Sequence, residues 1–486
     1  MLIGREREVG KLKELYESDS AELVALYGRR RVGKTFLVDS VFAGKITFRH
    51  SGLSPLDDRY ADESSRKSRL GDQLKHFTQS LALQGLLKSR KKPSSWLEAF
   101  YMLEDALQEK DNGVDRQLVF IDEIQWLDTP KSGFMTGLEA FWNGWACHRP
   151  NLMVIVCGSS TSWILNKLIH NHGGLYGRVT SQIRLLPFTL HECEKFFAAK
   201  GISFSRYDIT QAYMAVGGIP YYLRLFDRKL SLPQNIQAIF FDSDAPLREE
   251  FDELFSSTFT NPDTMKTIVR ALSKKESGLT RSELLQETKI ADSGEFSKQL
   301  KALISGNFIM PYCSYGTGKR EELYKLIDPF CIFSIRFVQT NVSSHLQWMN
   351  IEDSGSVTAW RGLAFENVCF HHAEQIKAAL GIRGVSTKES LWSRRGTEES
   401  PGAQIDMIID RRDRIVNLCE MKFTADMFTM KSDDHFALIR RKSTLTEFIP
   451  RRSSIQTTLV TTYGLTTNEY YSDFVHIVTI NELFAF

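Results

Sequence analysis

Residues 23–36 constrain the fold of this chain more than any other stretch of the sequence. The apolar run Leu-Val-Ala-Leu-Tyr leads into Gly28, and Gly33, Lys34 and Thr35 then complete the pattern G-x-x-x-x-G-K-T. The apolar run and the Phe-Leu-Val that follows the pattern predict a strand, a tight loop and a helix. Backbone N–H groups of such a loop point inward, and the start of the helix adds its positive dipole end. The sequence therefore predicts an α/β domain that binds a nucleoside triphosphate at this loop.

The predicted nucleotide contacts lie in the loop and directly after it. Lys34 is expected to reach the β- and γ-phosphates of ATP, and the hydroxyl of Thr35 is expected to bind Mg²⁺. A Gly-rich turn beside an ordinary lysine is the alternative, and the predicted strand and helix on either side argue against it. The residues expected to contact the nucleotide are Gly28, Arg29, Arg30, Arg31, Val32, Gly33, Lys34, Thr35 and Phe36.

The composition is that of a globular protein, with 42% hydrophobic and 25% charged residues. A chain of 486 residues is long enough for about three or four domains, so one site need not account for all of it. The formal net charge of +2 neither indicates nor excludes nucleic-acid binding. The seven cysteines are scattered singly, which favours reduced thiols. No run of about 18 apolar residues occurs, and the chain is charged from its fifth residue, so we expect a cytoplasmic protein without a membrane span.

A second acidic motif follows a predicted buried strand. Four apolar residues, 118–121, end in Asp122 and Glu123. The carboxyl ends of parallel strands are where ligands bind in open α/β sheets, so both carboxylates are expected at the nucleotide site. Asp122 is predicted to hold Mg²⁺ and Glu123 to orient and polarise the attacking water. The alternative is an exposed acidic turn.

Several motifs together resemble one known family. They are Gly-Arg-Glu at 4–6, the phosphate loop with its arginine run, Asp-Glu-Ile-Gln-Trp-Leu at 122–127, Leu-Tyr-Gly-Arg at 175–178 and Gly-Gly-Ile-Pro at 217–220. As a set they resemble the archaeal-type ATPase family within the STAND and AAA+ branch. The resemblance covers roughly the first half of the chain.

This resemblance implies roles for three further residues. Ser159, at the end of the predicted strand 152–157, is similar to the sensor residue of AAA+ relatives, which touches the γ-phosphate or the attacking water. Arg178 is similar to an arginine that stabilises charge on the transferred phosphoryl group. Pro220 is similar to a proline in a helical lid that senses adenine. The alternatives are a helix cap for Ser159, a surface ion pair for Arg178 and a simple turn for Pro220.

The segment from about 252 to 341 predicts a winged helix. A capping box, Thr280 with Glu283, begins one helix, and a second helix runs from Ser293 to Gly306. Strands at 308–310 and 323–326 on either side of a Gly-rich turn predict the wing. DNA phosphates are possible partners of Lys298, Lys301, Lys319 and Arg320, whereas Glu295, Glu321 and Glu322 dilute that charge. A spacer or protein contact is the alternative.

The last segment contains a second candidate site. Glu420 and Lys422 are two apart on a predicted strand and therefore share a face, and Asp406 lies on the strand before it. With Glu366 on a preceding helix, this pattern resembles the PD-(D/E)XK nuclease superfamily, although Ile405 stands where proline would. The arrangement is also similar to the C-terminal domain of unknown function that often accompanies this ATPase family.

The nuclease resemblance implies metal chemistry. Asp406 and Glu420, together with Glu366, are expected to bind one or two Mg²⁺ ions that activate water, and Lys422 to position that water or stabilise developing charge. A fold of this kind also survives as a non-catalytic binding domain, which is the alternative.

Together these patterns predict a four-part α/β protein. The parts are a P-loop NTPase core at 1–190, a helical lid at 191–245, a winged helix at 246–341 and a restriction-endonuclease-like domain at 342–486. The predicted function is an ATPase coupled to a Mg²⁺-dependent DNA nuclease in defence or DNA processing, with homo-oligomers left open. The alternative is a non-nucleolytic ATP-dependent switch that binds DNA or a protein through the winged helix.

Overall fold

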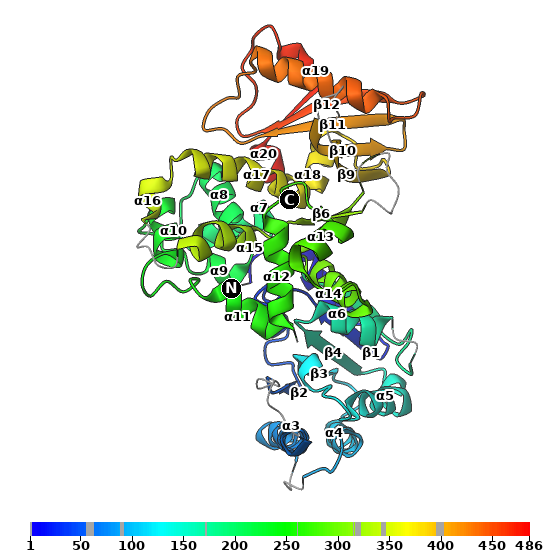
Figure 1. Cartoon of the computed structure of the whole chain (residues 1–486). Coiled ribbons are helices and arrows are strands. Elements are labelled where there is room, and N and C mark those ends of the chain that lie inside the picture. The colour runs from blue at the N-terminus through cyan, green and yellow to red at the C-terminus, as the bar shows by residue number, and fades with distance from the viewer. Residues whose placement is uncertain are drawn as a thin grey trace. The chain divides into compact units, whose positions relative to one another are not determined.

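The computed structural model describes most of the chain, and the ribbon in Figure 1 follows it from end to end. The described residues are 2–54, 63–87, 92–170, 173–259, 261–313, 315, 322–341, 347–394 and 403–486. They form two compact units, Met1–Leu186 and Pro187–Phe486.

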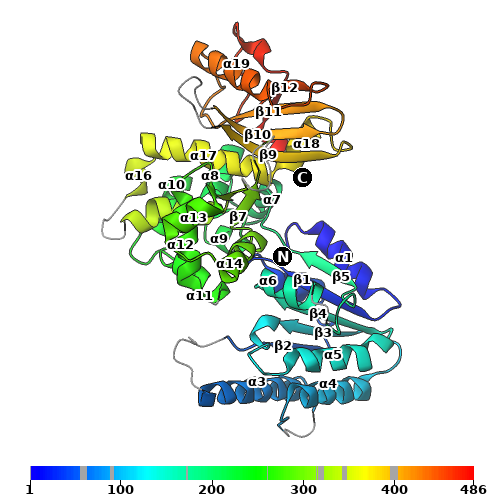
Figure 2. The ribbon, with the colours of Figure 1, turned by 45° about the vertical axis from the view of Figure 1, so that its right-hand side comes forward.

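The first unit is built on a parallel sheet of five strands in the order β2-β3-β4-β1-β5 (Figure 2). Every residue of β1, β3 and β4 is buried, as expected for central strands covered on both faces. The strands are β1 (Glu22–Tyr27), β2 (Phe48–Ser51), β3 (Gln117–Asp122), β4 (Leu152–Gly158) and β5 (Ser181–Arg184).

Helices complete the first unit, and an aromatic cluster packs them together. The ring of Phe100 lies 5.9 Å from that of Phe134 and 5.3 Å from that of Phe141, which joins α4 to α5. The helices are α1 (Glu6–Tyr16), α2 (Lys34–Val41), α3 (Glu63–Leu83), α4 (Trp96–Lys110), α5 (Phe134–Gly144) and α6 (Thr161–Trp163). Shorter or wider turns are η2 (Ile124–Trp126), η3 (Ala146–His148) and η4 (Ile164–Ile169).

The second unit begins with short helices that have well-defined starts. Thr189, Ser205 and Ser231 each form a capping box at a helix start. A sharp turn separates α8 from α9, because Gly217 has a φ of +64° and Pro220 is the first residue of α9. The helices are α7 (Leu190–Ala199), α8 (Arg206–Val216), α9 (Pro220–Leu223), α10 (Leu232–Phe240) and α11 (Glu250–Thr258).

A three-stranded antiparallel sheet in the order β6-β8-β7 follows, with three helices before and between its strands. Thr280 and Glu283 form the expected capping box, and Ser293 caps the next helix. Most of the expected wing turn, together with Lys319, Arg320 and Glu321, lies outside the described residues. The elements are α12 (Pro262–Ser273), β6 (Leu279–Thr280), α13 (Arg281–Thr288), α14 (Gly294–Ser305), β7 (Ile309–Tyr312) and β8 (Leu323–Leu326).

A connecting group of short helices leads to a mixed sheet in the order β13-β12-β11-β10-β9. The pairs β9–β10 and β10–β11 are antiparallel, whereas β11–β12 and β12–β13 are parallel. In Figures 1 and 2, α19 covers one face of this sheet and α17 lies on the other side.

The connecting helices are α15 (Pro329–Phe333), η6 (Ser334–Val338), η7 (Gln339–Asn341) and α16 (Trp348–Ile351). The strands of the mixed sheet are β9 (Thr387–Arg394), β10 (Ala403–Arg411), β11 (Ile415–Lys422), β12 (Ser454–Thr461) and β13 (His476–Thr479). The associated helices are α17 (Gly355–His371), α18 (Ala373–Ala379), α19 (Ser432–Thr446), η8 (Tyr471–Asp473) and α20 (Ile480–Leu483).

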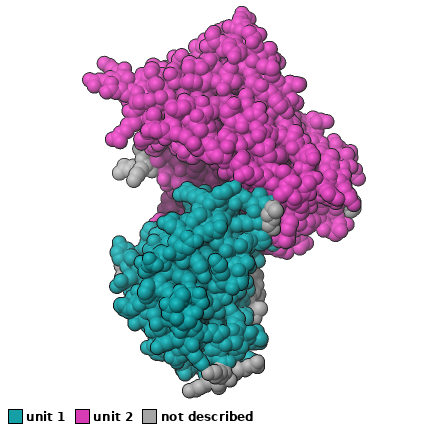
Figure 3. All heavy atoms as spheres, turned by 180° about the vertical axis from the view of Figure 1, so that it is seen from behind, with its two compact units in different colours: residues 1–186 teal, residues 187–486 magenta. Residues whose placement is uncertain are grey.

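Figure 3 colours the two units, whose division at Leu186 lies close to the predicted boundary at 190. The predicted lid, winged helix and C-terminal domain all fall in the second unit. An aromatic cluster explains why they cohere. The ring of Phe333 lies 4.6 Å from that of Phe240 and 5.3 Å from that of Trp360, and the ring of Tyr222 lies 4.9 Å from that of Phe330.

His372 also joins the start of α7 to the end of α17 within the second unit. Its Nε2 accepts a hydrogen bond of 2.9 Å from the N–H of Leu190, so Nδ1 carries the proton and donates to the carbonyl of Val368 at 2.7 Å. The side chain is fully buried, and burial lowers the pKa of His372 to about 4.

We predict that this histidine makes the stability of the protein fall as the pH is lowered from 6.5 to 4. In that window the unfolded chain takes up a proton that folded His372 does not, so the free energy of unfolding decreases by up to about 3 kcal/mol. Urea unfolding of wild type and His372→Gln at pH 7 and pH 4.5 measures the effect. The wild type should lose more stability than the variant, and equal losses would contradict the prediction.

Candidate nucleotide site and acidic cluster

The phosphate loop follows β1 and ends at the start of α2, as its sequence pattern predicts. Gly33 precedes the helix with a φ of +91°. A side chain at Gly28 would place its Cβ 2.2 Å from the carbonyl oxygen of Leu185, so only glycine fits there. The N-terminal motif reaches the same loop, because Nη2 of Arg5 donates to the carbonyl of Val32 at 3.4 Å.

Lys34 and Thr35 have the contacts expected of a site that holds phosphate and a cation. Nζ of Lys34 is buried and donates to the carbonyls of Gly28 and Arg29 at 3.0 and 3.1 Å. The hydroxyl of Thr35 donates to Oδ2 of Asp122 at 2.7 Å. A hydroxyl and a carboxylate that meet at the loop are the oxygen ligands that Mg²⁺ prefers, so the donor set fits ATP with Mg²⁺.

Glu123 lies at the end of β3 in a left-handed conformation with a φ of +46°. Its Oε2 accepts a hydrogen bond of 2.8 Å from the hydroxyl of Ser159 and one of 3.2 Å from the same residue's N–H. Gln125, which the sequence analysis did not single out, also donates to this oxygen. The end of β4 thus meets the end of β3, and Ser159 contacts the predicted catalytic glutamate.

The residue that precedes α6 is Ser160, not Ser159, and its side chain makes no capping hydrogen bond. Arg178 is exposed, and its side chain makes no hydrogen bond or ion pair with any residue that the structure describes. Pro220 lies in the second unit as the first residue of α9. The first unit therefore brings together Lys34, Thr35, Asp122, Glu123 and Ser159, but not Arg178.

Three carboxylates converge in the C-terminal domain, on two strands and one helix. Glu366 of α17, Asp406 of β10 and Glu420 of β11 are each at least nine-tenths buried. Burial and the charges of Glu420 and Glu366 raise the pKa of Asp406 to about 8. Burial, opposed by Lys325, also raises the pKa of Glu366. The four residues singled out from the sequence, including Lys422, therefore interact electrostatically.

Cations and one backbone donor hold these carboxylates. Oε1 of Glu420 accepts from Lys422 at 2.8 Å, and Oε2 accepts from Arg441 of α19 at 2.8 Å. Burial alone would lower the pKa of Lys422, but the neighbouring Glu420 raises it above its ordinary value. The N–H of Met421 donates to Asp406 at 2.9 Å.

The cluster provides carboxylate oxygens for a metal ion such as Mg²⁺, but the positive side chains of Lys422 and Arg441 already pair with Glu420. Among the residues that the structure describes, no three His, Cys, Asp or Glu side chains are arranged to hold a metal ion. Both oxygens of Glu420 bind positive side chains, so a metal ion there would have to replace Lys422 or Arg441.

Lys325 and Arg441 are functional candidates that the sequence analysis missed. Lys325 is on β8, and its Nζ lies 3.3 Å from Oε2 of Glu366 in a buried ion pair. Arg441 is on α19, a helix that packs against the mixed sheet. No local spacing relates either residue to the carboxylate that it contacts.

The comparisons with known proteins agree with the geometry of the first unit. The family described as "ATPase domain predominantly from Archaea" matches residues 2–226. Residues 2–226 are therefore similar to this archaeal-type ATPase domain, and the match supports ATP hydrolysis as the activity of this part of the chain. Over 412 residues the chain is 25% identical to "Uncharacterized protein MJECL04" of Methanocaldococcus jannaschii, and the match covers 82% of this chain and 83% of that protein.

Two solved structures are similar at a lower level. The Walker-type ATPase PABY2304 of Pyrococcus abyssi has a TM-score of 0.45 and 21% identity, over 69% of this chain and 96% of that chain. The ORC2 protein of Aeropyrum pernix has a TM-score of 0.41 and 12% identity, over 71% and 96%.

A membrane-spanning helix was not expected from the sequence. None of the helices in the described part of the chain is long and apolar enough to cross a bilayer.

The contacts of Glu123 lead to a prediction about hydrolysis. Glu123→Gln keeps the shape of the side chain and can still hydrogen-bond Ser159, but it cannot polarise water as a carboxylate does. We expect ATP binding to persist and the turnover rate to fall by about 10²-fold or more. Nucleotide binding and phosphate release measure the two effects, with Glu14→Gln, an exposed residue of α1, as the control. Hydrolysis by Glu123→Gln at the wild-type rate would contradict the prediction.

The buried pair of Lys325 and Glu366 leads to a prediction about stability. Lys325→Met leaves a buried carboxylate without its cation, and we expect the free energy of unfolding to fall by about 3 kcal/mol. Adding Glu366→Gln should recover part of the loss, because an uncharged amide is less costly to bury alone. Denaturant unfolding measures both, with the exposed Lys298→Met as the control. A loss in Lys298→Met equal to that in Lys325→Met would refute the assignment of the effect to this pair.

Proposed function

We propose that ATP binding and hydrolysis by this chain are coupled to Mg²⁺-dependent cleavage of DNA by the C-terminal domain. The single observation that carries the proposal is the convergence of buried Glu366, Asp406 and Glu420 beside Lys422. Three buried acids whose charges repel one another are costly unless a cation or a reaction requires them, so such a cluster is a candidate functional site.

In the nucleotide site, Lys34 would contact the phosphates with the ammonium that now binds two backbone carbonyls. Thr35 and Asp122 would hold Mg²⁺, which neutralises charge on the phosphates when bound. Glu123 would orient the attacking water. Its hydrogen bonds from Ser159 would tie that orientation to the end of β4. Arg178 would act either within its own subunit or on a neighbouring one, and Pro220 would act from the helical lid.

In the C-terminal site, Asp406, Glu420 and Glu366 are not arranged to hold a metal ion as they stand. They would hold Mg²⁺ only after Glu420 leaves Lys422 or Arg441, and the bound ion would lower the pKa of its water. The Met421 N–H fixes the direction of the Asp406 carboxylate. Lys422, two residues from Glu420 on β11, would hold the water or the phosphate oxygen. Arg441 would contribute a second positive charge for a DNA phosphate.

The proposed substrate is DNA because the module before the C-terminal domain has the element order expected of a winged helix. Lys298 and Lys301 of α14 would contact phosphates, although Glu295 pairs with Lys298 at 3.7 Å. Defence against foreign DNA and DNA processing are both roles for such an enzyme.

The second candidate is a non-nucleolytic, ATP-dependent switch. A specific observation favours it: Lys422 and Arg441 occupy both oxygens of Glu420. If these ion pairs persist, the C-terminal domain would act by binding DNA or a partner protein.

Cleavage of labelled linear, circular and single-stranded DNA with Mg²⁺ or Mn²⁺, with and without ATP, separates the two candidates. We predict that Lys422→Ala lowers cleavage by about 10²-fold or more without changing ATP hydrolysis. Lys34→Ala should remove the dependence of cleavage on ATP.

Two exposed lysines provide matched controls. Lys442→Ala on α19 and Lys13→Ala on α1 should behave as the wild type does. Absence of cleavage by a wild type that still hydrolyses ATP would favour the switch. Cleavage by Lys422→Ala at the wild-type rate would place the activity outside the acidic cluster.

A further inference from the structure

A cavity of about 350 Å³ lies in the second unit, next to the acidic cluster but outside it. One wall is a stripe of α17 formed by Trp360, Leu363, Ala364 and Asn367, which recur at helical spacing. Leu272 and Ile332 contribute apolar surface opposite this stripe. The volume is within the range of small-molecule sites, and the lining combines apolar side chains with several polar and charged ones.

Two polar atoms at opposite ends of the stripe are buried and unsatisfied. The indole Nε1 of Trp360 and the amide Oδ1 of Asn367 have no hydrogen-bond partner among the residues that the structure describes. The two side chains are only 2% and 4% exposed. Seven residues of helix separate them, which corresponds to about 10 Å along the axis. Both atoms are closed to water, so a ligand reaches them only when the side chains shift slightly. Such a ligand accepts a hydrogen bond from Trp360 at one end and donates one to Asn367 at the other.

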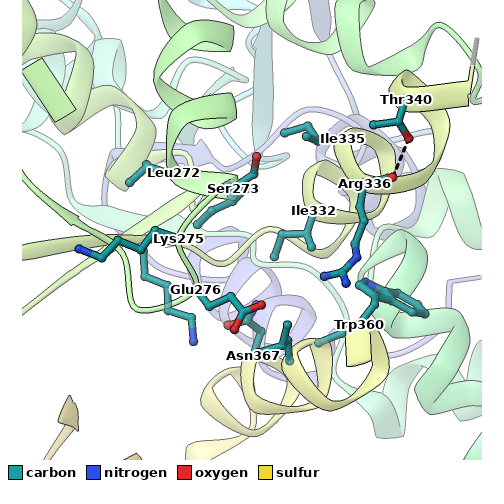
Figure 4. Close-up of a pocket in the computed structure, with 14 residues that line it drawn as sticks. Leu272, Ser273, Lys275, Glu276, Ile332, Ile335, Arg336, Thr340, Trp360 and Asn367 are labelled. Carbon is teal, nitrogen blue, oxygen red and sulfur yellow. Dashed lines mark hydrogen bonds between the residues drawn. The ribbon is translucent and has the colours of Figure 1, made fainter. Parts of the chain in front are cut away.

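The charged side chains of the cavity match the two unsatisfied atoms: a cation lies near Trp360 and an anion near Asn367. Nη2 of Arg336 donates to the carbonyl of Ser356 at 3.4 Å, one helical turn before Trp360. Figure 4 shows its guanidinium directed toward Trp360 and the carboxylate of Glu276 directed toward Asn367. Glu276 also interacts with Glu366, the residue next to Asn367, and contributes to its raised pKa.

Two lysines also line the cavity, and each forms an ion pair with a glutamate that does not line it. Nζ of Lys275 pairs with Glu283 at 2.9 Å, and Nζ of Lys325 pairs with Glu366 at 3.3 Å. The net polarity is therefore positive at the Trp360 end and negative at the Asn367 end.

We propose that this cavity binds an elongated zwitterion whose anionic group lies at Arg336 and Trp360, whose amine lies at Glu276 and Asn367, and whose apolar middle lies along Leu363 and Ala364. The chemical class comprises ω-amino acids and short apolar peptides with free ends. Either end group alone would leave one buried polar atom unsatisfied. The site does not depend on nuclease activity. It shares Lys325 with the acidic cluster, so an occupant would lie next to that ion pair.

The test uses 8-aminooctanoate as the probe and octanoate and octylamine as single-ended comparators. Ligand-observed NMR and thermal unfolding of the full chain give the affinities. We expect 8-aminooctanoate to bind at least about tenfold more tightly than either comparator, because each charged end adds a hydrogen-bonded contact.

Two substitutions, at half-buried Arg336 and exposed Glu276, should not disturb folding and test the polarity. Arg336→Gln should weaken 8-aminooctanoate and octanoate by about tenfold and leave octylamine within about twofold. Glu276→Gln should weaken 8-aminooctanoate and octylamine and leave octanoate unchanged. The controls Arg383→Gln and Glu295→Gln should have no effect. Equal affinities for the three probes, no binding at about 10 mM, or substitutions that affect all three alike would overturn the proposal.

Discussion

Burial of carboxylates at or near strand ends is the constraint on which both sites depend. Asp122 at the end of β3 and Glu420 near the end of β11 are each at least nine-tenths buried. A buried carboxylate is tolerated only when donors or cations surround it. In the first unit the donors are neutral, the hydroxyl of Thr35 and the N–H of Glu123. In the C-terminal domain they are the cations Lys422 and Arg441.

This requirement also explains why the second unit coheres. The carboxylate of Glu366 in α17 finds its cation on β8, in a module that precedes the C-terminal domain. His372, directly after the last residue of α17, accepts a hydrogen bond from the first residue of α7. A single helix of the C-terminal domain thus makes buried polar contacts with both earlier parts of the unit. Such contacts are costly to break, so the parts are expected to move together rather than as independent domains.

Local patterns predicted local structure well. The loop at Gly28 to Thr35, the capping box at Thr280 and the strand 415–422 lie where the sequence places them, because each depends on adjacent residues. Helix α17 begins at Gly355 because Ser354 caps it, a start that the apolar pattern alone does not mark. Lys325 and Arg441 could not be predicted, since their partners are 41 and 21 residues away and only tertiary packing relates them.

The two sites differ in what a ligand must displace. Lys34 is held by two neutral carbonyls, which incoming phosphate oxygens replace with stronger, charge-assisted bonds. Glu420 is held by two cations, so a metal ion that binds there must first break charge-assisted bonds. If DNA is the substrate, its phosphates offer Lys422 and Arg441 an alternative anion and release Glu420. On the proposed function, metal and DNA would then bind cooperatively, since each relieves the charge that the other leaves unpaired.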